Sequence, residues 1–263
     1  MLPEERKNLI CDIVNKKKAI KVSDLSKRLG ITEATVRRDL DELQNEKKIR
    51  RTHGGAVALY PAGGRFAISD LAVERIQEKI KIAKRAYEFI DNYDTLLLDG
   101  SSTVLELCKL IANGPKKDIT VVTNAFSVVT AFANKLDITV VHVGGEVTYP
   151  INSSIGKLAE KAINNIRVDK TFLGVNGIDV EYGYSISNLR EAAVKMQMIK
   201  SAKQVFVLAD HTKFGSTYLA KIAEFTGEVD YLITDERIKD FDYGTYNEYV
   251  NLIIVDEEEE TNN

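Results

Sequence analysis

The chain has 263 residues, of which 44% are hydrophobic, 29% charged and 8% aromatic. This composition is typical of globular proteins and excludes a collagen-like or largely disordered chain. At roughly 150 residues per domain, the length predicts one large or two modest domains. No apolar run approaches the ~18–20 residues of a membrane span, and the charged start MLPEERKNLICDIV is unlike a secretory signal. We therefore expect a cytoplasmic protein with no membrane partner.

Charge is distributed unevenly between the start of the chain and the rest. The formal net charge is −3, but residues 1–58 hold 14 Lys and Arg against 9 Asp and Glu, a net charge of +5. The remaining residues are therefore acidic, and 256–263 is predicted to be a solvated acidic tail. A basic head on an acidic body favours a protein whose head alone contacts a polyanion.

The two cysteines, Cys11 and Cys108, lie in helix-like apolar contexts. Two cysteines are too few for a disulfide framework or a four-ligand zinc site. We expect both to be small core residues, and we expect no metal ion or cofactor.

The head begins with two predicted helices. Pro3 suits a first helical turn, and apolar residues recur at helical spacing over 3–16. A short β-prone stretch at 19–22 follows. Ser23 is then expected to be the N-cap of a second helix, which Gly30 ends because glycine readily adopts the left-handed conformation at a helix C-terminus.

A third helix begins at Thr32, which is predicted to be its N-cap, with Ile31 forming a hydrophobic staple to Val36. Its apolar residues recur at i, i+4 and i+7, so the arginines lie off the core face. The basic stretch 47–51 predicts a strand, and 53–55 a turn. The apolar residues of the third helix that recur at this spacing are Val36, Leu40 and Leu43.

The predicted order of elements over residues 1–58 is helix, short strand, helix, tight turn, helix and basic hairpin. This order predicts a winged helix-turn-helix domain. Such a domain places a helix in the major groove of DNA and a basic wing on the flanking phosphates. The alternative is a small helical bundle whose arginines are merely solvated. The expected DNA contacts are Ser23, Thr32, Glu33, Thr35, Arg37, Arg38, Arg51 and His53.

A family resemblance rests on residue identities at fixed spacing. Arg6, Ile10 and Val14 recur four apart, and after a gap of 17 residues come Thr32 and the run TVRRDL. The later run RTHGGA completes the pattern. This pattern resembles that of DeoR-type bacterial transcriptional regulators.

The body alternates strands and helices after a predicted linker at 59–72, which contains Pro61, Gly63 and Gly64 without periodicity. Continuous apolar strands separated by helices predict an α/β domain with a mostly parallel sheet over 73–255. A helical pattern begins at Val73 and continues through Ile90. The predicted strands are 96–98, 119–122, 138–143, 171–173, 205–208, 231–234 and 252–255, and the further predicted helices are 104–112, 125–134, 157–165 and 188–202.

Small polar loops and glycines follow successive predicted strands. The loop Ser101-Ser102-Thr103 lies between a strand and a helix, where backbone N–H groups and hydroxyls favour an anion. The alternative is a simple helix cap. Thr123-Asn124 and Gly144-Gly145 follow the next two strands, and Lys213 follows a later one. Ligands bind such sheets beyond the carboxyl ends of the strands.

The body also resembles the DeoR-type sensor domain, because LDGSST, VVTN, GGE, SIG, REA and ADHTKFG occur in its order. That domain is similar in fold to ribose-5-phosphate isomerases and glucosamine-6-phosphate deaminases. The resemblance implies a phosphorylated sugar effector, operator DNA and association into a homodimer or homotetramer. The family loop commonly reads Gly-Thr-Thr, but here a serine stands first. The implied effector residues are Asp99, Ser101, Ser102, Thr103, Thr123, Asn124, Gly145 and Lys213.

The leading hypothesis is therefore a transcriptional regulator, a repressor of sugar metabolism genes without enzymatic activity. One rival is a sugar-phosphate isomerase or deaminase with an appended DNA-binding domain, for which Asp99, Asp210 and His211 are the available acids and bases. The isomerases' acidic Asp-Gly-Ala-Asp-Glu segment is absent from the sequence. A third reading, a DNA-associated scaffold without a ligand, leaves the hydroxyl loop unexplained.

Overall fold

The computed structural model describes residues 3–17, 19–46, 48–52, 54–58, 75–148, 152–240 and 244–256. The chain divides into two compact units, residues 1–64 and 65–263. The predicted linker 59–72 and nearly all of the predicted acidic tail 256–263 lie outside the described residues, as does His53. Within those ranges, no helix is long and apolar enough to cross a membrane.

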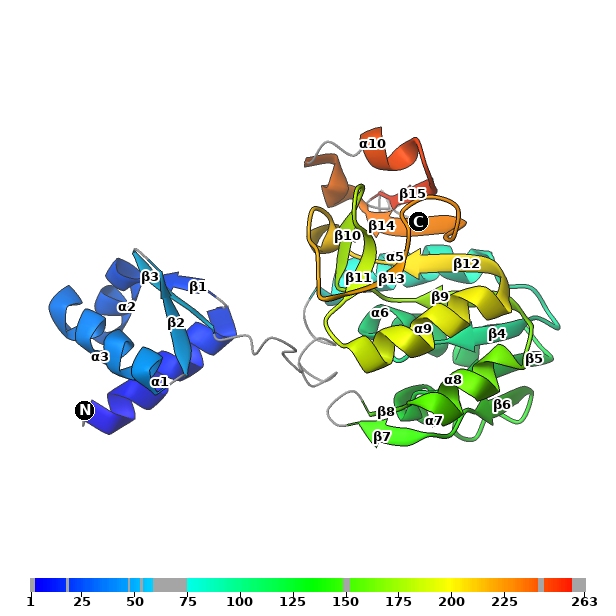
Figure 1. Ribbon diagram of the computed structural model, residues 1–263, viewed down its shortest axis with the longest axis horizontal. Helices are drawn as coiled ribbons and strands as arrows, with labels where there is room; N and C mark the ends of the chain where they lie inside the picture. The colour runs from blue at the N-terminus through cyan, green and yellow to red at the C-terminus, as the bar shows by residue number, and fades with distance from the viewer. Residues whose placement is uncertain are drawn as a thin grey trace, which may run out of the picture. The chain divides into compact units, whose positions relative to one another are not determined.

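The first unit contains three helices and a small antiparallel sheet (Figure 1). Its sheet has the order β1-β3-β2, so the wing strands β2 and β3 pair with each other and β3 also pairs with β1. The fold is therefore the predicted winged helix-turn-helix. Its elements are α1 (Pro3–Lys17), β1 (Ala19–Lys21), α2 (Val22–Leu29), α3 (Glu33–Asn45), β2 (Ile49–Thr52) and β3 (Gly55–Ala58).

Two of the three predicted helix ends are confirmed. Gly30 ends α2 with a φ of 65°, and the Thr32 side chain accepts a hydrogen bond from the Thr35 amide at the start of α3. The prediction for Ser23 was wrong, because α2 begins at Val22, two residues earlier than an N-cap at Ser23 requires, with Lys21 as its N-cap and no side-chain cap. The Val22 amide donates instead to the Gly54 carbonyl at 2.9 Å, so the wing satisfies it.

The second unit is built on a seven-stranded sheet in which every neighbouring pair is parallel. Its strand order is β15-β14-β12-β9-β4-β5-β6. All seven strands were predicted from their apolar runs. They are β4 (Thr95–Leu98), β5 (Ile119–Thr123), β6 (Ile138–His142), β9 (Val168–Leu173), β12 (Ala202–Leu208), β14 (Tyr231–Asp235) and β15 (Asn251–Val255).

Helices cover both faces of this sheet, and alternate residues of β4 show how the core is divided. Leu96 and Leu98 pack with one set of helices, whereas Leu97 packs with the other. The first set is α5 (Ile76–Glu88), α6 (Ser102–Asn113) and α7 (Phe126–Ala131), and the second is α8 (Lys157–Asn164) and α9 (Leu189–Ser201). Figure 1 shows α8 and α9 in front of the sheet. Cys108 is buried in the first core and Cys11 packs against the core of the first unit, as expected.

The second unit also contains smaller elements outside the seven-stranded sheet, which sequence analysis did not predict. A hairpin pairs β7 (Glu146–Thr148) with β8 (Ser153–Ile155), and a three-stranded antiparallel sheet has the order β10-β11-β13. The remaining elements are β10 (Gly177–Asp179), β11 (Gly183–Ile186), η1 (His211–Lys213), β13 (Ala220–Ala223), η2 (Glu236–Asp240) and α10 (Gly244–Asn247).

Candidate functional site

The outer face of α3 carries the side chains that sequence analysis assigned to DNA. Thr32, Glu33, Arg37 and Arg38 are exposed and Thr35 is half-buried. Arg37 pairs with Glu33 at 2.9 Å and Arg38 with Glu42 at 3.5 Å, each one helical turn away. Exposed pairs of this kind hold the side chain only weakly, so both arginines are available to an external anion.

A buried clamp fixes α3 against α1, and sequence analysis did not foresee it. The Arg6 guanidinium donates two hydrogen bonds to the Asp39 carboxylate, at 2.6 and 3.0 Å. Such a two-point contact sets orientation as well as distance. Asp39 is 3% exposed, so the clamp lies on the core side of α3 and leaves the opposite side to solvent. Arg6 and Asp39 both belong to the sequence pattern that resembles DeoR-type regulators, but their spacing alone did not show that they pair.

Arg51 connects the wing to α3. Its amide donates to the Gln44 side chain at 2.8 Å, and its guanidinium pairs with Asp41. Ser23 lies half-buried in the first turn of α2. Of the eight residues expected to contact DNA, the structure therefore groups five on or just before α3, and places Ser23 on α2 and Arg51 on β2.

In the second unit, the order of the strands defines a switch point between β4 and β9. The chain continues from β4 to β5 and β6 on one side, and then from β9 to β12, β14 and β15 on the other. Loops from neighbouring strands diverge at such a point, which is where open α/β sheets bind ligands. The loops that meet there are Asp99–Ser101 after β4 and Gly174 after β9.

These two loops are in close contact. A Cβ added at Gly174 would lie 2.4 Å from the Ser101 Cβ, so only glycine fits. The Asp99 carboxylate accepts hydrogen bonds from the Ser101 amide at 2.9 Å and the Gly174 amide at 2.8 Å. Asp99, expected to face the effector, therefore directs both oxygens to the loops that surround it.

A buried lysine completes this arrangement. Lys195 of α9 pairs with Asp99 and donates to the Gly174 carbonyl at 2.8 Å. Burial lowers the pKa of Lys195, but the carboxylates of Asp99 and Glu191 outweigh burial and hold this pKa above its ordinary value. The lysine is therefore charged and offsets the charge of Asp99. Sequence analysis missed it, although it lies on the same helix stripe as Ala192, Met198 and Ile199.

The hydroxyl loop begins α6. Ser101 is the N-cap position, but its side chain makes no capping hydrogen bond. Its Oγ is buried and has no hydrogen-bond partner within the described chain. The first amides of α6 have no acceptor within the helix, because a helix begins with unpaired N–H groups. Half-buried Ser102 and buried Thr103 occupy the first turn, so donors converge at one helix N-terminus.

Three further expected residues lie at the neighbouring strand ends and make structural contacts. Thr123 donates to the Leu98 carbonyl at 2.7 Å, which joins β5 to β4. The Asn124 side chain donates to the Ser154 carbonyl at 2.8 Å. A Cβ at Gly145 would lie 2.7 Å from the Ile155 carbonyl oxygen, so this glycine permits the close approach of β8.

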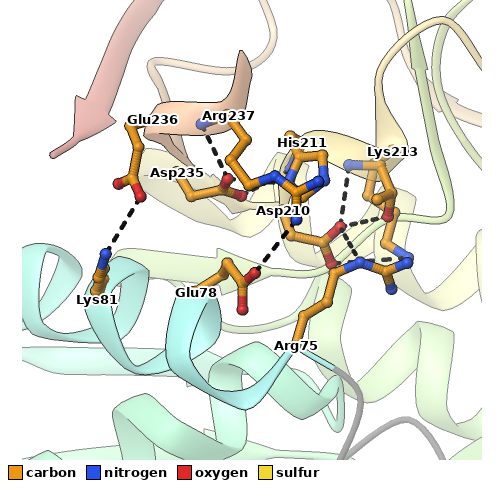
Figure 2. Close-up of polar contacts among 10 residues, drawn as sticks. Arg75, Glu78, Lys81, Asp210, His211, Lys213, Asp235, Glu236 and Arg237 are labelled. Carbon is orange, nitrogen blue, oxygen red and sulfur yellow. Dashed lines mark hydrogen bonds and ion pairs between the residues drawn. The ribbon is translucent and has the colours of Figure 1, made fainter. Parts of the chain in front are cut away.

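Lys213 lies at the same sheet edge, beyond β12, and its nearest described carboxylate belongs to Asp210. The Lys213 Nζ lies 3.9 Å from one Asp210 oxygen, and the Arg75 Nε lies 4.0 Å from the other (Figure 2). Asp210 also accepts a hydrogen bond from the Thr212 amide at 3.0 Å. Burial raises the pKa of Asp210, but Lys213, Thr212 and Arg75 outweigh burial and hold it below its ordinary value.

The next strand end carries a buried acid and histidine. Asp235 is fully buried and accepts from the amide and the Nδ1 of His211, both at 2.8 Å. The Arg237 amide also donates to Asp235, at 3.2 Å. Figure 2 shows Asp235 and His211 beside Asp210 and its two cations. In the part of the chain that the structure describes, no group of three or more His, Cys, Asp or Glu residues is arranged to hold a metal ion.

Both units of the chain match models of known protein families. Residues 6–61 match the model of the DeoR-like helix-turn-helix domain, and residues 74–236 match that of the DeoR C-terminal sensor domain. A winged helix-turn-helix with cationic side chains on the outer face of α3 defines the class as DNA-binding transcriptional regulators. Within that class, the chain belongs to the DeoR family.

Relatives align over almost the whole chain. YulB of Bacillus subtilis strain 168, an HTH-type transcriptional regulator, is 36% identical over 89% of this chain and 90% of its own. GlcR of the same organism, an HTH-type transcriptional repressor, is 34% identical over 89% of each chain. Among solved structures, a D-ribose-5-phosphate isomerase is 19% identical with a TM-score of 0.40, over 53% of this chain and 54% of that chain.

Proposed function

We propose that the protein represses genes of sugar metabolism and that a phosphorylated sugar changes its affinity for operator DNA. The hydroxyl loop at the start of α6 carries this proposal. It places unpaired amides, the buried Ser101 Oγ and two further hydroxyls at the switch point, where a phosphate needs several donors. GlcR and a putative aga operon transcriptional repressor from Escherichia coli O157:H7 are repressors by name, which supports the repressor role.

Lys195 supports phosphate binding at this loop indirectly. Without a cation, the Asp99 carboxylate behind the loop would repel a phosphate. The buried Lys195 ammonium reduces that repulsion, because it pairs directly with the Asp99 carboxylate. The proposed effector residues remain Ser101, Ser102 and Thr103 for the phosphate, with Asp99 supporting the loop, and Thr123, Asn124, Gly145 and Lys213 around the sugar.

The proposal includes no catalysis. An isomerase needs an acid or base that faces the sugar carbons. The three candidates, Asp99, Asp210 and His211, are each buried and engaged by other groups of the chain. An assay of pentose and hexose phosphate isomerisation tests this point, and turnover by the purified protein would contradict it.

A thermal-shift screen against phosphorylated pentoses and hexoses tests the effector proposal. A ligand at a hundred times its Kd stabilises the folded state by about 2.7 kcal/mol, which for a domain of this size raises Tm by roughly 5–11 °C. The matching unphosphorylated sugars should give no shift. If no phosphorylated sugar shifts Tm more than its unphosphorylated form, the proposal fails.

We also propose that the protein binds DNA as a homodimer or homotetramer, because symmetric assemblies suit paired operator half-sites. Light scattering on the purified chain, alone and with DNA, tests this proposal. A monomer on DNA would contradict it.

A further inference from the structure

The buried pair of Asp99 and Lys195 has a third charged neighbour, Glu191, which belongs to the REA run of the sequence. Glu191 lies in the first turn of α9, one turn before Lys195, and its Oε1 lies 3.6 Å from the Lys195 Nζ. Lys195 also contacts the Asp99 carboxylate and the Gly174 carbonyl. A second carboxylate therefore lies at the switch point, beside the loops that the proposed effector contacts.

Glu191 is the most accessible member of this charged group. Its side chain is 25% exposed, whereas the side chains of Lys195 and Asp99 are 6% and 3% exposed. Lys195 and Asp99 connect it to the hydroxyl loop, because Asp99 accepts a hydrogen bond from the Ser101 amide at 2.9 Å. The Glu191 carboxylate is thus open to solvent on the α9 side of the site, and the hydroxyl loop lies on the α6 side.

The Glu191 carboxylate has few hydrogen-bond donors of its own. A hydrogen bond between an ammonium and a carboxylate typically spans about 2.8 Å, so the 3.6 Å to Lys195 is long. Burial raises the pKa of Glu191 above its ordinary value, and the attraction of Lys195 offsets burial only in part. The adjacent Arg190 pairs with Glu146 instead. The ionised carboxylate therefore lacks donors, which a ligand can supply.

The charges of this group favour a ligand that carries donors as well as a phosphate. One lysine between two carboxylates leaves an excess negative charge when both acids are ionised, and this charge repels a phosphate. An ionised carboxylate only accepts hydrogen bonds, so Glu191 attracts hydroxyl and ammonium groups. A sugar phosphate carries such groups on the carbon chain that bears its phosphate.

We propose that Glu191 is an effector-binding residue that accepts hydrogen bonds from hydroxyl or ammonium groups of the sugar while the hydroxyl loop holds the phosphate. This inference rests on the proposed function, because it requires a phosphate at the hydroxyl loop. It assigns the phosphate to the start of α6 and a polar edge of the sugar to the start of α9. Glu191 thus selects sugar phosphates over simpler phosphates.

Calorimetric titration into the full chain tests this selection. The probes are inorganic phosphate, ribose 5-phosphate, glucose 6-phosphate and glucosamine 6-phosphate, together with the phosphorylated sugar that raises Tm most in the thermal screen. The wild-type protein should bind at least one sugar phosphate about ten- to a hundredfold more tightly than inorganic phosphate, the gain expected from one charge-assisted hydrogen bond. Tighter binding of glucosamine 6-phosphate than of glucose 6-phosphate identifies the donor as an ammonium, and the reverse identifies it as a hydroxyl.

Variants assign this preference to Glu191. Glu191→Gln should lower the preference about ten- to a hundredfold and leave inorganic phosphate bound at least as tightly, because a repulsive charge is removed. Glu191→Asp keeps the charge on a shorter side chain and should retain part of the preference. Glu160→Gln is the matched control, because it neutralises an acid of α8, which packs against α9, and the partner of Glu160 is the exposed Lys157. This control should leave the preference unchanged.

The ratio of the two affinities separates ligand binding from a structural role. If Glu191 only supports Lys195, Glu191→Gln changes the affinities for inorganic phosphate and for sugar phosphates by the same factor. That result, or a wild-type protein without a preference for any sugar phosphate, refutes the inference while phosphate binding at the hydroxyl loop stands. Turnover in the isomerase assay that Glu191→Gln abolishes would make Glu191 a general base and overturn its assignment as a binding residue.

Failure of the proposed function has a different signature. If the wild-type protein binds none of the probes and no phosphorylated sugar raises its Tm, both the effector proposal and this inference fail. Urea unfolding curves for Glu191→Gln and Glu191→Asp confirm that the variants are folded. If Glu191→Gln is unfolded, the sugar preference of Glu191→Asp decides, and a preference equal to that of the wild type refutes the inference.

Discussion

Replacing Lys195 with methionine tests whether the switch point depends on a buried charge pair. Methionine keeps much of the volume of lysine and removes its charge. The side chains of Lys195 and Asp99 are 6% and 3% exposed, so solvent cannot replace the lost partner. Asp99 would keep the two amide donors from Ser101 and Gly174 but would lose the only cation described in contact with it.

The expected cost follows from burial. Removing one partner of a buried ion pair costs about 3–5 kcal/mol, because a charge stays behind without compensation. For a domain of 150–250 residues, each kcal/mol lowers Tm by roughly 2–4 °C, so Lys195→Met should lower it by roughly 6–20 °C. Lys203→Met is the control, because Lys203 pairs with Asp169 at 2.8 Å but is 74% exposed. The control should cost less than about 1 kcal/mol.

Urea unfolding of wild type, both single variants and the double variant Asp99→Asn/Lys195→Met measures these costs. The cost of the double variant should be smaller than the sum of its two single costs, because the residues interact directly. If Lys195→Met destabilises the protein no more than Lys203→Met, the pair does not stabilise the switch point and our explanation of the reduced repulsion at the hydroxyl loop is wrong.

Three further predictions concern other parts of the chain. Arg37→Ala with Arg38→Ala should abolish tight operator binding and leave ligand-induced stabilisation intact, as measured by fluorescence anisotropy and thermal shift; normal operator affinity would refute the assignment of α3. A fragment starting at Val73 should unfold cooperatively and bind the effector but not DNA, and an insoluble fragment would show that the boundary is misplaced. The stability difference between wild type and Lys213→Met, of the order of 1 kcal/mol, should be constant from pH 7 to 5. It should decrease as the pH falls below the ordinary pKa of aspartate and disappear only below the lowered folded-state pKa of Asp210, because the pair is lost when Asp210 takes up a proton in the folded protein. A pH-independent difference would contradict this.

Much of the fold could be predicted because its signals are local. Each of the seven parallel strands is a short apolar run, and the helices between them keep their periodicity. The short antiparallel strands were missed because each has only three or four residues, too few to show an alternating pattern, and one of their pairings is also distant in sequence. Ser185 of β11 pairs with Lys221 of β13, and neither strand has more than four residues. Ser23 was misplaced because the start of α2 depends on a contact that is distant in sequence. The Gly54 carbonyl accepts a hydrogen bond from the Val22 amide, so no side-chain cap is needed.

The site was predicted by position rather than by contact. The hydroxyl loop and Lys213 do lie at the carboxyl edge of the sheet. Sequence analysis did not foresee that Asp99 would turn inward, because its partner Lys195 lies 96 positions away. A charged residue on an otherwise apolar helix stripe was the available signal. Arg75 gave no comparable signal, since only the fold brings it to Asp210.

The most direct test of ligand-controlled DNA binding is a DNA titration of the full chain, with and without a phosphorylated sugar that raises its Tm. The DNA is a sequence selected by the protein from a random pool. Our account predicts that the ligand changes the Kd for this DNA by about 5- to 150-fold, the usual range of coupling between two sites. Lys213→Ala should bind the DNA as wild type does and respond less to the same ligand concentration. Equal Kd values with and without every stabilising phosphorylated sugar would contradict the account.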